Sequence, residues 1–234
     1  MNATRTQQQR RQVDRQQRIL IVDDHPIFRK GIAMLLEHEQ DIIIGGEAET
    51  AAEAMGLVEH HEFDLVIADI SLKDINGIEL VKSLKVCKPH LPVLVLSMHD
   101  ESLYAERALR AGARGYLMKQ APPDQVVAAI RQVLRGDLYL SAAANLLMLN
   151  SFVAGRGGIH SKSSMEKLSD RELEIFELLG QGRGTSQIAH DLCLSVKTIE
   201  AHRSHIKTKF GITTAPELVR AAVEWLTRRT QRGD

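Results

Sequence analysis

The sequence predicts a doubly wound α/β domain followed by a smaller module made only of helices. Five short apolar runs without polar alternation occur before residue 120, and a helical pattern follows each of them. Such runs are typical of strands that are buried on both faces of a parallel sheet. From Leu168 onward the chain shows helical patterns and no strand signal. At 234 residues, it is long enough for two ordinary domains.

The predicted strands and helices alternate up to about residue 135. We expect the strands at residues 18–22, 41–45, 63–68, 91–96 and 115–118. The helices are expected from Pro26, from Thr50 to about His60, through Leu80 and Leu84, from Leu103 to Ala111, and from Pro122 to Leu134. The apolar face of the first helix is predicted to consist of Ile27, Ile32, Leu35 and Leu36. Periodicity leaves the order of the strands in the sheet open.

Polar side chains of one chemical set stand at the carboxyl ends of four of these runs. Asp23 and Asp24 follow the first run and Asp69 follows the third. Ser97 follows the fourth run and Lys119 follows the fifth. In open parallel sheets, ligands bind at the carboxyl ends of the strands. We therefore expect three carboxylates, a hydroxyl and an amine to converge on one edge of the sheet.

This set of groups is suited to magnesium and phosphoryl chemistry. Neighbouring carboxylates repel each other unless a cation lies between them, and Mg²⁺ prefers oxygen ligands and phosphate partners. A carboxylate can attack phosphorus to form an aspartyl phosphate, while a metal ion and a lysine neutralise the charge on the transferred group. The hydroxyl of Ser97 is suited to a hydrogen bond with a phosphate oxygen.

Charge is divided unevenly along the chain, although the formal net charge is zero. Residues 1–18 carry five Arg and one Asp, a net charge of +4. Residues 19–160 carry 13 basic and 19 acidic residues, a net charge of −6, and residues 161–234 carry 12 basic and 10 acidic residues, a net charge of +2. The acidic first domain suits a cation site, and the weakly basic second domain permits nucleic-acid binding.

Targeting segments and cysteine frameworks are missing from the sequence. No stretch reaches the roughly 18 apolar residues of a membrane span, and residues 1–18 lack the apolar core of a secretory signal, so we expect a cytoplasmic protein. Cys87 and Cys193 form no disulfide or zinc pattern, and buried or half-buried reduced thiols are expected. The Gln- and Arg-rich tail, residues 1–17, is expected to be disordered, with a basic arm that touches DNA or a membrane as the alternative.

From Leu168 onward, the patterns predict four short helices, the last at about residues 215–228. The expected N-caps of the first three are Ser169, in a capping box with Glu172, then Thr185 or Ser186, and Ser195. In the third helix, Ile199, His202, Ile206 and Phe210 share one face by their spacing. The other side is polar and cationic, which suits a helix that enters a major groove. An ordinary amphipathic helix with a solvated face has the same pattern.

Residues 18–135 resemble the receiver domain of two-component response regulators of the NarL/FixJ type. The resemblance rests on Asp23, Asp24, Asp69 and Lys119 and on the motifs Asp24-His25-Pro26, Asn76-Gly77, Leu96-Ser97-Met98-His99-Asp100 and Gly112-Ala113-Arg114-Gly115-Tyr116. It implies a flavodoxin-like (CheY-like) doubly wound sheet of five parallel strands. One position departs from the family's pattern, because Lys73 stands where proline is frequent, four residues after Asp69.

The receiver resemblance also implies a role for each residue at the strand ends. Asp69 is implied as the phospho-acceptor, and the residues that sense the phosphoryl group are implied to be Ser97, Lys119 and Tyr116. The implied ligands of Mg²⁺ are Asp23, Asp24, Asp69 and the backbone carbonyl of Ser71.

Residues 165–229 resemble the LuxR-type helix-turn-helix domain, a module of four helices. The resemblance rests on residues 168–174, 180–182, 188–189 and 194–207. It implies base contacts from Glu200, Ala201 and Ser204, and phosphate contacts from Lys197, Thr198, Arg203 and Lys207. Ser186 departs from the family's pattern, which commonly has lysine there. The counterpart of the last helix helps the family's modules to dimerise on DNA; the alternative is that its apolar residues only close the module's own core.

Together, the two resemblances imply a DNA-binding transcriptional regulator of a two-component phosphorelay, not an enzyme. A sensor histidine kinase would phosphorylate Asp69, and phosphorylation would release or dimerise the DNA-binding domain. The implied partners are that kinase, double-stranded DNA, RNA polymerase and a second copy of the chain on DNA, with no membrane. Residues 136–164 are expected to form a linker with a short helix at about 141–150, and residues 230–234 a tail.

Two other functions stay open on the sequence. A DNA-binding regulator that is independent of phosphorylation would use its receiver-like domain to bind another protein. A phosphatase with an Asp nucleophile would need a second acidic residue two positions after Asp69, where the chain has Ser71.

Overall fold

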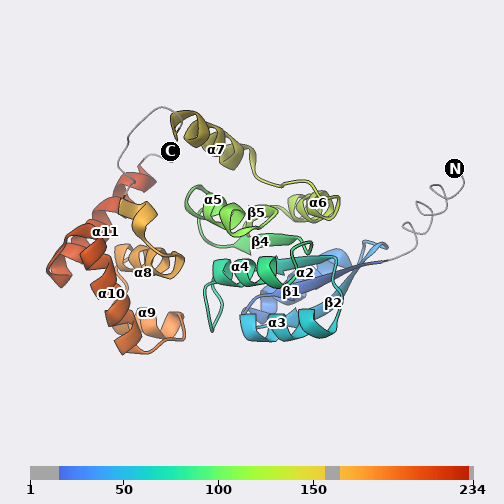
Figure 1. Ribbon diagram of the computed structural model, residues 1–234, viewed down its shortest axis with the longest axis horizontal. Helices are drawn as coiled ribbons and strands as arrows, with labels where there is room; N and C mark the ends of the chain where they lie inside the picture. The colour runs from blue at the N-terminus through green and yellow to red at the C-terminus, as the bar shows by residue number, and fades with distance from the viewer. Residues whose placement is uncertain (1–15, 156–163, 232–234) are drawn as a thin grey trace, which may run out of the picture. The chain divides into compact units, whose positions relative to one another are not determined.

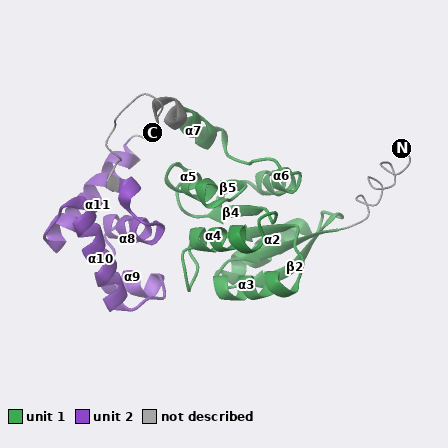
Figure 2. Ribbon diagram, viewed as in Figure 1, with its two compact units in different colours: residues 1–151 green, residues 152–234 purple. Residues whose placement is uncertain are grey.

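A computed structural model describes residues 16–155 and 164–231 of the chain. The chain divides into two compact units, residues 1–151 and residues 152–234 (Figure 2). The basic tail predicted to be disordered lies outside the described residues except for Gln16 and Gln17, and Gln17 is the first residue of a strand. The part of the predicted linker at residues 156–163 also lies outside them.

Strands and helices alternate in the first unit (Figure 1). They are β1 (Gln17–Val22), α2 (Pro26–Leu36), β2 (Ile42–Ala48), α3 (Ala51–His60), β3 (Leu65–Ala68), α4 (Gly77–Cys87), β4 (Val93–Ser97), α5 (Glu101–Ala111), β5 (Gly115–Met118) and α6 (Pro123–Leu134). All strand pairs are parallel, and the order in the sheet is β2-β1-β3-β4-β5. This is the flavodoxin-like order, so the predicted fold class is confirmed.

The sheet is buried on both faces, which explains why its strands are continuous apolar runs. All residues of β3 and β4 are buried. Alternate strand side chains, among them Ile19, Ile67 and Leu94, form one core with the buried sides of α2 and α6. Helix α4 contacts both α3 and α5, and α3 and α5 pack on strands of the sheet. Helices therefore cover both faces, as a doubly wound sheet requires.

Three helices of the first unit begin at side-chain caps close to the carboxyl ends of the strands. Thr50, Asn76 and Asp100 each accept a backbone N–H from the first turn of α3, α4 and α5 respectively. These caps satisfy N–H groups that have no partner within the helix. At the other end of α5, Gly112 has a φ of 113°, a left-handed conformation that favours glycine and ends the helix.

Three local predictions for the first unit were wrong. β2 continues to Ala48, beyond the predicted end at residue 45, because it pairs with β1 over the whole length of that strand. Ile27, predicted on the buried face of α2, is 88% exposed. It lies five residues before Ile32, which is about 140° around the helix. Cys87, predicted to be buried or half-buried, is exposed because it is the last residue of α4.

Helix α7 (Ala142–Gly155) lies in the segment where the sequence predicts a short linker helix. Near its start, the hydroxyl of Ser141 donates a hydrogen bond to Oε1 of Glu101 at 2.6 Å, and Ala144 is buried. Leu146 and Leu149 are 61% and 63% exposed. Within the described ranges, neither α7 nor any other helix has both the length and the apolar character needed to cross a membrane.

The second unit is helical throughout its described residues. It contains the 3₁₀ helix η1 (Ser164–Lys167) and helices α8 (Asp170–Gly180), α9 (Thr185–Asp191), α10 (Val196–Phe210) and α11 (Ala215–Thr230). The ring of Phe176 in α8 stacks on Phe210 in α10 at 5.1 Å and lies 5.6 Å from the ring of Trp225 in α11. Leu218 and Ala222 of α11 are fully buried. These residues of α11 therefore close the unit's own core.

Two local predictions for the second unit were also wrong. Neither Thr185 nor Ser186 caps α9; the N-cap is Gly184, whose N–H donates to Oε1 of Gln187 at 3.0 Å. The hydroxyl of Thr185 instead accepts a hydrogen bond from the guanidinium of Arg203. Cys193 is exposed, because it lies in the turn after α9 with a φ of 51°. The predicted capping box of Ser169 and Glu172 is present.

Candidate functional site

The strand ends of the first unit bring charged side chains from β1, β3 and β5 into contact. Nζ of Lys119 lies 2.6 Å from Oδ2 of Asp23 and 2.7 Å from Oδ2 of Asp69, and none of the three side chains is more than 5% exposed. The N–H of Asp69 donates to the carbonyl of Val22 at 2.9 Å, and the N–H of Lys119 donates to the carbonyl of Ser97 at 2.8 Å. These bonds align the strand ends at one edge of the sheet.

Desolvation penalises the charged forms of two carboxylates at this edge of the sheet. Burial raises the pKa of Asp69, an effect that Lys119 opposes and Asp23 reinforces. Burial also raises the pKa of Asp24, against the opposing effect of His25. A group in which ionised carboxylates are penalised by desolvation gains most from an additional cation. The electrostatics therefore favour cation binding beside Asp69.

The donor set fits a magnesium ion. One ligand atom from each of Asp23, Asp24, His25 and Asp69 lies within 4.8 Å of the others. Oδ1 of Asp24 is buried and accepts no hydrogen bond, although Nδ1 of His25 lies 2.7 Å from it. Carboxylate oxygens with unfilled lone pairs are the ligands that Mg²⁺ prefers. The imidazole of His25 is a neighbour that sequence reasoning did not select.

Ser97 and Tyr116 are connected through the backbone of His99. The hydroxyl of Ser97 is buried and accepts the N–H of His99 at 3.3 Å. Tyr116 is fully buried, and its hydroxyl donates to the carbonyl oxygen of His99 at 2.7 Å. The ring of Tyr116 is thus turned inward. Nε2 of His99 lies 3.0 Å from Oγ of Ser71, on the loop that follows Asp69.

Lys73 belongs to an ion-pair chain that reaches the backbone of the acidic pair. Its Nζ lies 2.6 Å from Oε2 of Glu49, and Oε1 of Glu49 lies 2.9 Å from Nη2 of Arg29. Nη1 of Arg29 donates to the carbonyl oxygen of Asp23 at 2.6 Å. The hydrogen bond from Lys73 is the largest cause of a lowered pKa at Glu49. The sequence singled out Lys73, but its partners come from distant segments and had no sequence signal.

The residues selected on α10 differ in exposure. Lys197, Glu200, Ala201 and Ser204 are exposed, whereas those that are half-buried are Thr198, Arg203 and Lys207. On the opposite side, Ile199 and Ile206 are fully buried, and α10 contacts both α8 and α9. Arg203 donates to Thr185, so this cation also ties α9 to α10. One face of α10 is thus seated on the unit's core while the other is open to a partner.

Comparison with known proteins identifies both units. The family model of the response regulator receiver domain matches residues 19–131, and that of the LuxR family of bacterial regulatory proteins matches residues 166–222. The oxygen regulatory protein NreC of Staphylococcus carnosus (strain TM300) is 36% identical over 210 residues, which are 88% of this chain and 97% of that protein. The chain therefore belongs to the response regulators with a LuxR-type DNA-binding domain.

Solved structures of other response regulators are similar to this one. A LuxR-family two-component response regulator from Aurantimonas sp. SI85-9A1 is 33% identical with a TM-score of 0.56, covering 59% of this chain and 99% of that chain. RcsB of Salmonella enterica serovar Typhimurium, bound to promoter rprA in the presence of the phosphomimetic BeF3-, is 25% identical with a TM-score of 0.58. That match covers 88% of this chain and 97% of the RcsB chain.

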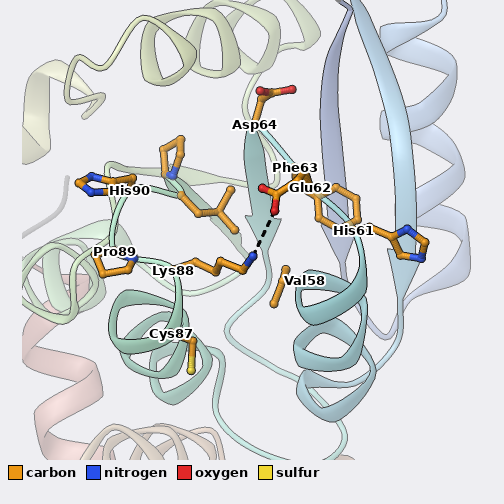
Figure 3. A pocket seen from close by; sticks show the side chains of 11 residues that line it. Val58, His61, Glu62, Phe63, Asp64, Cys87, Lys88, Pro89 and His90 are labelled. Atoms are coloured by element: carbon orange, nitrogen blue, oxygen red, sulfur yellow. Dashed lines mark hydrogen bonds and ion pairs between the residues drawn. The ribbon is translucent and has the colours of Figure 1, made fainter.

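The response regulator also has a cavity of about 390 Å³, whose lining residues are drawn in Figure 3. Its lining comes largely from residues 61–64, before β3, and residues 87–92, before β4. An ion pair of 3.4 Å joins Lys88 to Glu62 beside it. Because the strands run from these segments toward Asp69, the cavity lies at the opposite edge of the sheet and takes no part in the strand-end site.

Proposed function

We propose that a sensor histidine kinase phosphorylates Asp69 of this response regulator, and that phosphorylation increases the affinity of α10 for DNA. The observation that carries the proposal is the buried contact of Lys119 with both Asp69 and Asp23. It lies beside the carboxylate oxygen of Asp24 that accepts no hydrogen bond. This arrangement supplies an acceptor, a fixed cation and an incomplete set of metal ligands in one place.

In the proposed transfer, a carboxylate oxygen of Asp69 attacks the phosphorus of the kinase's phosphohistidine. The O–P bond forms as the N–P bond breaks, and the imidazole leaves with the electron pair of that bond. Lys119, 2.7 Å from Oδ2 of Asp69, offsets the charge on the phosphoryl oxygens. The ligands that we propose for Mg²⁺, which would add further charge neutralisation, are Asp23, Asp24, Asp69 and the backbone carbonyl of Ser71.

The proposed switch uses groups that already surround Asp69. A phosphoryl group adds charge and strong acceptor oxygens, which the hydroxyl of Ser97 and the ammonium of Lys119 are suited to bind. Reorientation of Ser97 would act on His99, because the Ser97 hydroxyl accepts the His99 N–H. Since Tyr116 donates to the His99 carbonyl, phosphorylation would stabilise the inward Tyr116 and alter the surface around α5 and β5.

We propose that the kinase docks at an apolar groove beside the strand-end group. The groove, of about 820 Å³, lies between α2 and the start of α6 and includes Lys119 among its lining residues. Ile27, Met34 and Met98 line it and are 88%, 66% and 60% exposed. Large exposed apolar side chains that cluster in this way are typical of protein-binding surfaces. A kinase helix seated there would lie next to the acceptor.

For DNA, we propose that α10 enters the major groove with Glu200, Ala201 and Ser204 toward the base edges. Phosphate contacts are assigned to Lys197, Thr198, Arg203 and Lys207. The buried Ile199 and Ile206 support this orientation, because they direct the opposite face outward. A cytoplasmic location, dimerisation on DNA and contact with RNA polymerase belong to the same proposal, as does the lack of an enzymatic activity beyond phosphoryl acceptance.

The test is phosphorylation of wild-type protein and of Asp69→Asn by acetyl phosphate or a kinase, followed by measurement of DNA affinity. We expect the wild type to gain the phosphoryl label and at least about tenfold in affinity, a coupling of about 1.4 kcal/mol. Asp69→Asn should gain neither. Asp137→Asn, an exposed position after the end of α6, is the matched control and should behave as the wild type.

Labelling of Asp69→Asn together with an equal gain in affinity would contradict the proposal. The regulator that is independent of phosphorylation is not favoured, because the matches cover both the receiver and the LuxR-type domain. It would be supported by equal DNA affinity of the labelled and unlabelled wild type.

A further inference from the structure

Three side chains with metal-ligating atoms meet where α8 packs against α10. They are Glu172 of α8 and His202 and His205 of α10, and one ligand atom from each lies within 4.8 Å of the others. The group is in the second unit, so it is distinct from the strand-end carboxylates. It is not part of the proposed contacts with DNA.

Local structure determines the positions of all three side chains. Glu172 is the third residue of α8 and forms the capping box with Ser169, whose N–H donates to Oε2 of Glu172 at 2.8 Å. His202 and His205 are three residues apart on α10, so they share one side of that helix. Their rings stand nearly perpendicular, at 88°, with centroids 6.5 Å apart. The helix pair therefore presents two imidazoles to one carboxylate.

Each member has a ligand atom to offer. Oε1 of Glu172 lies 3.9 Å from Nδ1 of His205, while Oε2 is the atom bonded to Ser169 and to Lys209. Nδ1 of His202 is buried and makes no hydrogen bond. Burial lowers the pKa of His202, a direction that favours the neutral imidazole, and a metal ligand must be neutral. A buried imidazole nitrogen without a partner has a cost that a metal bond would remove.

We propose that Glu172, His202 and His205 bind one divalent ion of the zinc type, which joins α10 to α8. Two imidazole nitrogens and one carboxylate oxygen are a recurrent ligand set for Zn²⁺, with a fourth position left for water. Tetrahedral ligands of zinc lie about 3.3 Å from each other, given bonds of about 2.0–2.1 Å. Closure from 3.9 Å requires a small rotation of His205, whose side chain is 68% exposed.

The ammonium group of Lys209 would compete with this ion for the carboxylate of Glu172. Its Nζ lies 2.5 Å from Oε2 of Glu172, and the positive charges of Lys209 and Arg171 both act on His202. A divalent ion would be repelled by these charges, so the affinity of the wild type is reduced by them. The side chain of Lys209 is 35% exposed and is able to turn toward water when the ion binds.

The experiment is calorimetric titration of the full-length protein with ZnCl₂ alone as the probe, in excess Mg²⁺ so that the strand-end carboxylates are occupied. Wild type is compared with His205→Ala, which removes an exposed ligand without disturbing the core. The matched control is His190→Ala, a histidine of α9 whose side chain is 90% exposed. Lys209→Gln tests the competition.

We expect the wild type and His190→Ala to bind one more Zn²⁺ than His205→Ala. Lys209→Gln should bind that ion at least about threefold more tightly, since a repelling charge has been removed. The midpoint of thermal unfolding should rise with Zn²⁺ in the wild type and rise less in His205→Ala. Equal zinc stoichiometry in wild type and His205→Ala would overturn the proposal, as would the absence of zinc binding by the wild type.

Discussion

Gly77 is the first residue of α4, and a β-carbon at this position would stand 1.9 Å from the carbonyl oxygen of Asp69. Its N–H also donates to the carbonyl of Ile70 at 2.6 Å. The backbone at Asp69 and Ile70 and the start of α4 thus approach so closely that no side chain fits between them. At the scale of single residues, the close approach of this loop to α4 requires a glycine at position 77.

Gly77→Ala should therefore destabilise the protein, although Gly→Ala inside a helix ordinarily stabilises by about 0.5–1 kcal/mol. Backbone atoms must move to admit the methyl group, and we expect a loss of about 1–3 kcal/mol. Urea unfolding measures the change. Gly56→Ala, in α3 with nothing within 4 Å of the added carbon, is the control and should be neutral or stabilising. A stabilising Gly77→Ala would show that the loop is not tightly packed there.

At the scale of elements, the loop that follows β3 also caps α3. Asp74 accepts the N–H groups of Ala51 and Ala52 at 3.0 and 2.9 Å, the first two residues of that helix. These bonds and one from Ile75 lower the pKa of Asp74 although burial opposes the change. The ion pair of Lys73 with Glu49 lies beside them. The loop that follows β3 is therefore tied to the start of α3.

Asp74→Ala should cost about 1 kcal/mol of unfolding free energy at pH 7, the usual value for a lost helix cap. Because the folded state has the lower pKa, the carboxylate stabilises the fold above the unfolded pKa of about 3.9. This contribution is lost as pH falls through the lowered pKa. The variant should therefore lose less stability than the wild type between pH 5 and pH 2. Urea unfolding at both pH values measures this difference. The control is Asp137→Ala, at an exposed position, which should alter the loss of unfolding free energy between the two pH values by less than about 0.5 kcal/mol.

The proposed DNA contacts give different expected roles to residues on the exposed side of α10. Lys197→Ala should weaken binding to every DNA sequence and reduce the slope of log affinity against log salt by about one unit, because one phosphate contact is lost. Ser204→Ala should instead change the preference among sequences while the slope stays the same. Fluorescence anisotropy over a range of salt concentrations distinguishes the two. A slope unchanged in Lys197→Ala would remove that residue from the phosphate contacts.

At the scale of the whole molecule, the proposed switch requires the acceptor in the first unit to alter the behaviour of α10 in the second. Beryllofluoride with Mg²⁺ mimics the phosphoryl group without covalent chemistry. We expect it to raise affinity for a DNA duplex selected with this protein by at least about tenfold, and EDTA to reverse the effect. Asp69→Asn should not respond. An equal affinity with and without beryllofluoride would show that the two units act independently.

Much of the architecture was predictable because it depends on interactions between neighbours in the chain. Apolar runs marked the strands, and polar residues such as Asp69 and Lys119 stood directly after them. The capping box of Ser169 and Glu172 needed only a spacing of three residues. Strand order was not determined by periodicity and came from the family resemblance. The sequence by itself thus determined the fold class, the two-domain plan and the list of candidate residues.

Only the tertiary structure decided which of these groups meet and which face water. The ion pair of Lys73 with Glu49 and the approach of His202 to Glu172 bring together segments that no local pattern connects. The same holds for the exposure of Ile27 and Cys87, which depends on where a helix ends and how it is rotated against the sheet. Contacts between residues distant in sequence depend on the packing of whole elements, which periodicity and caps do not specify.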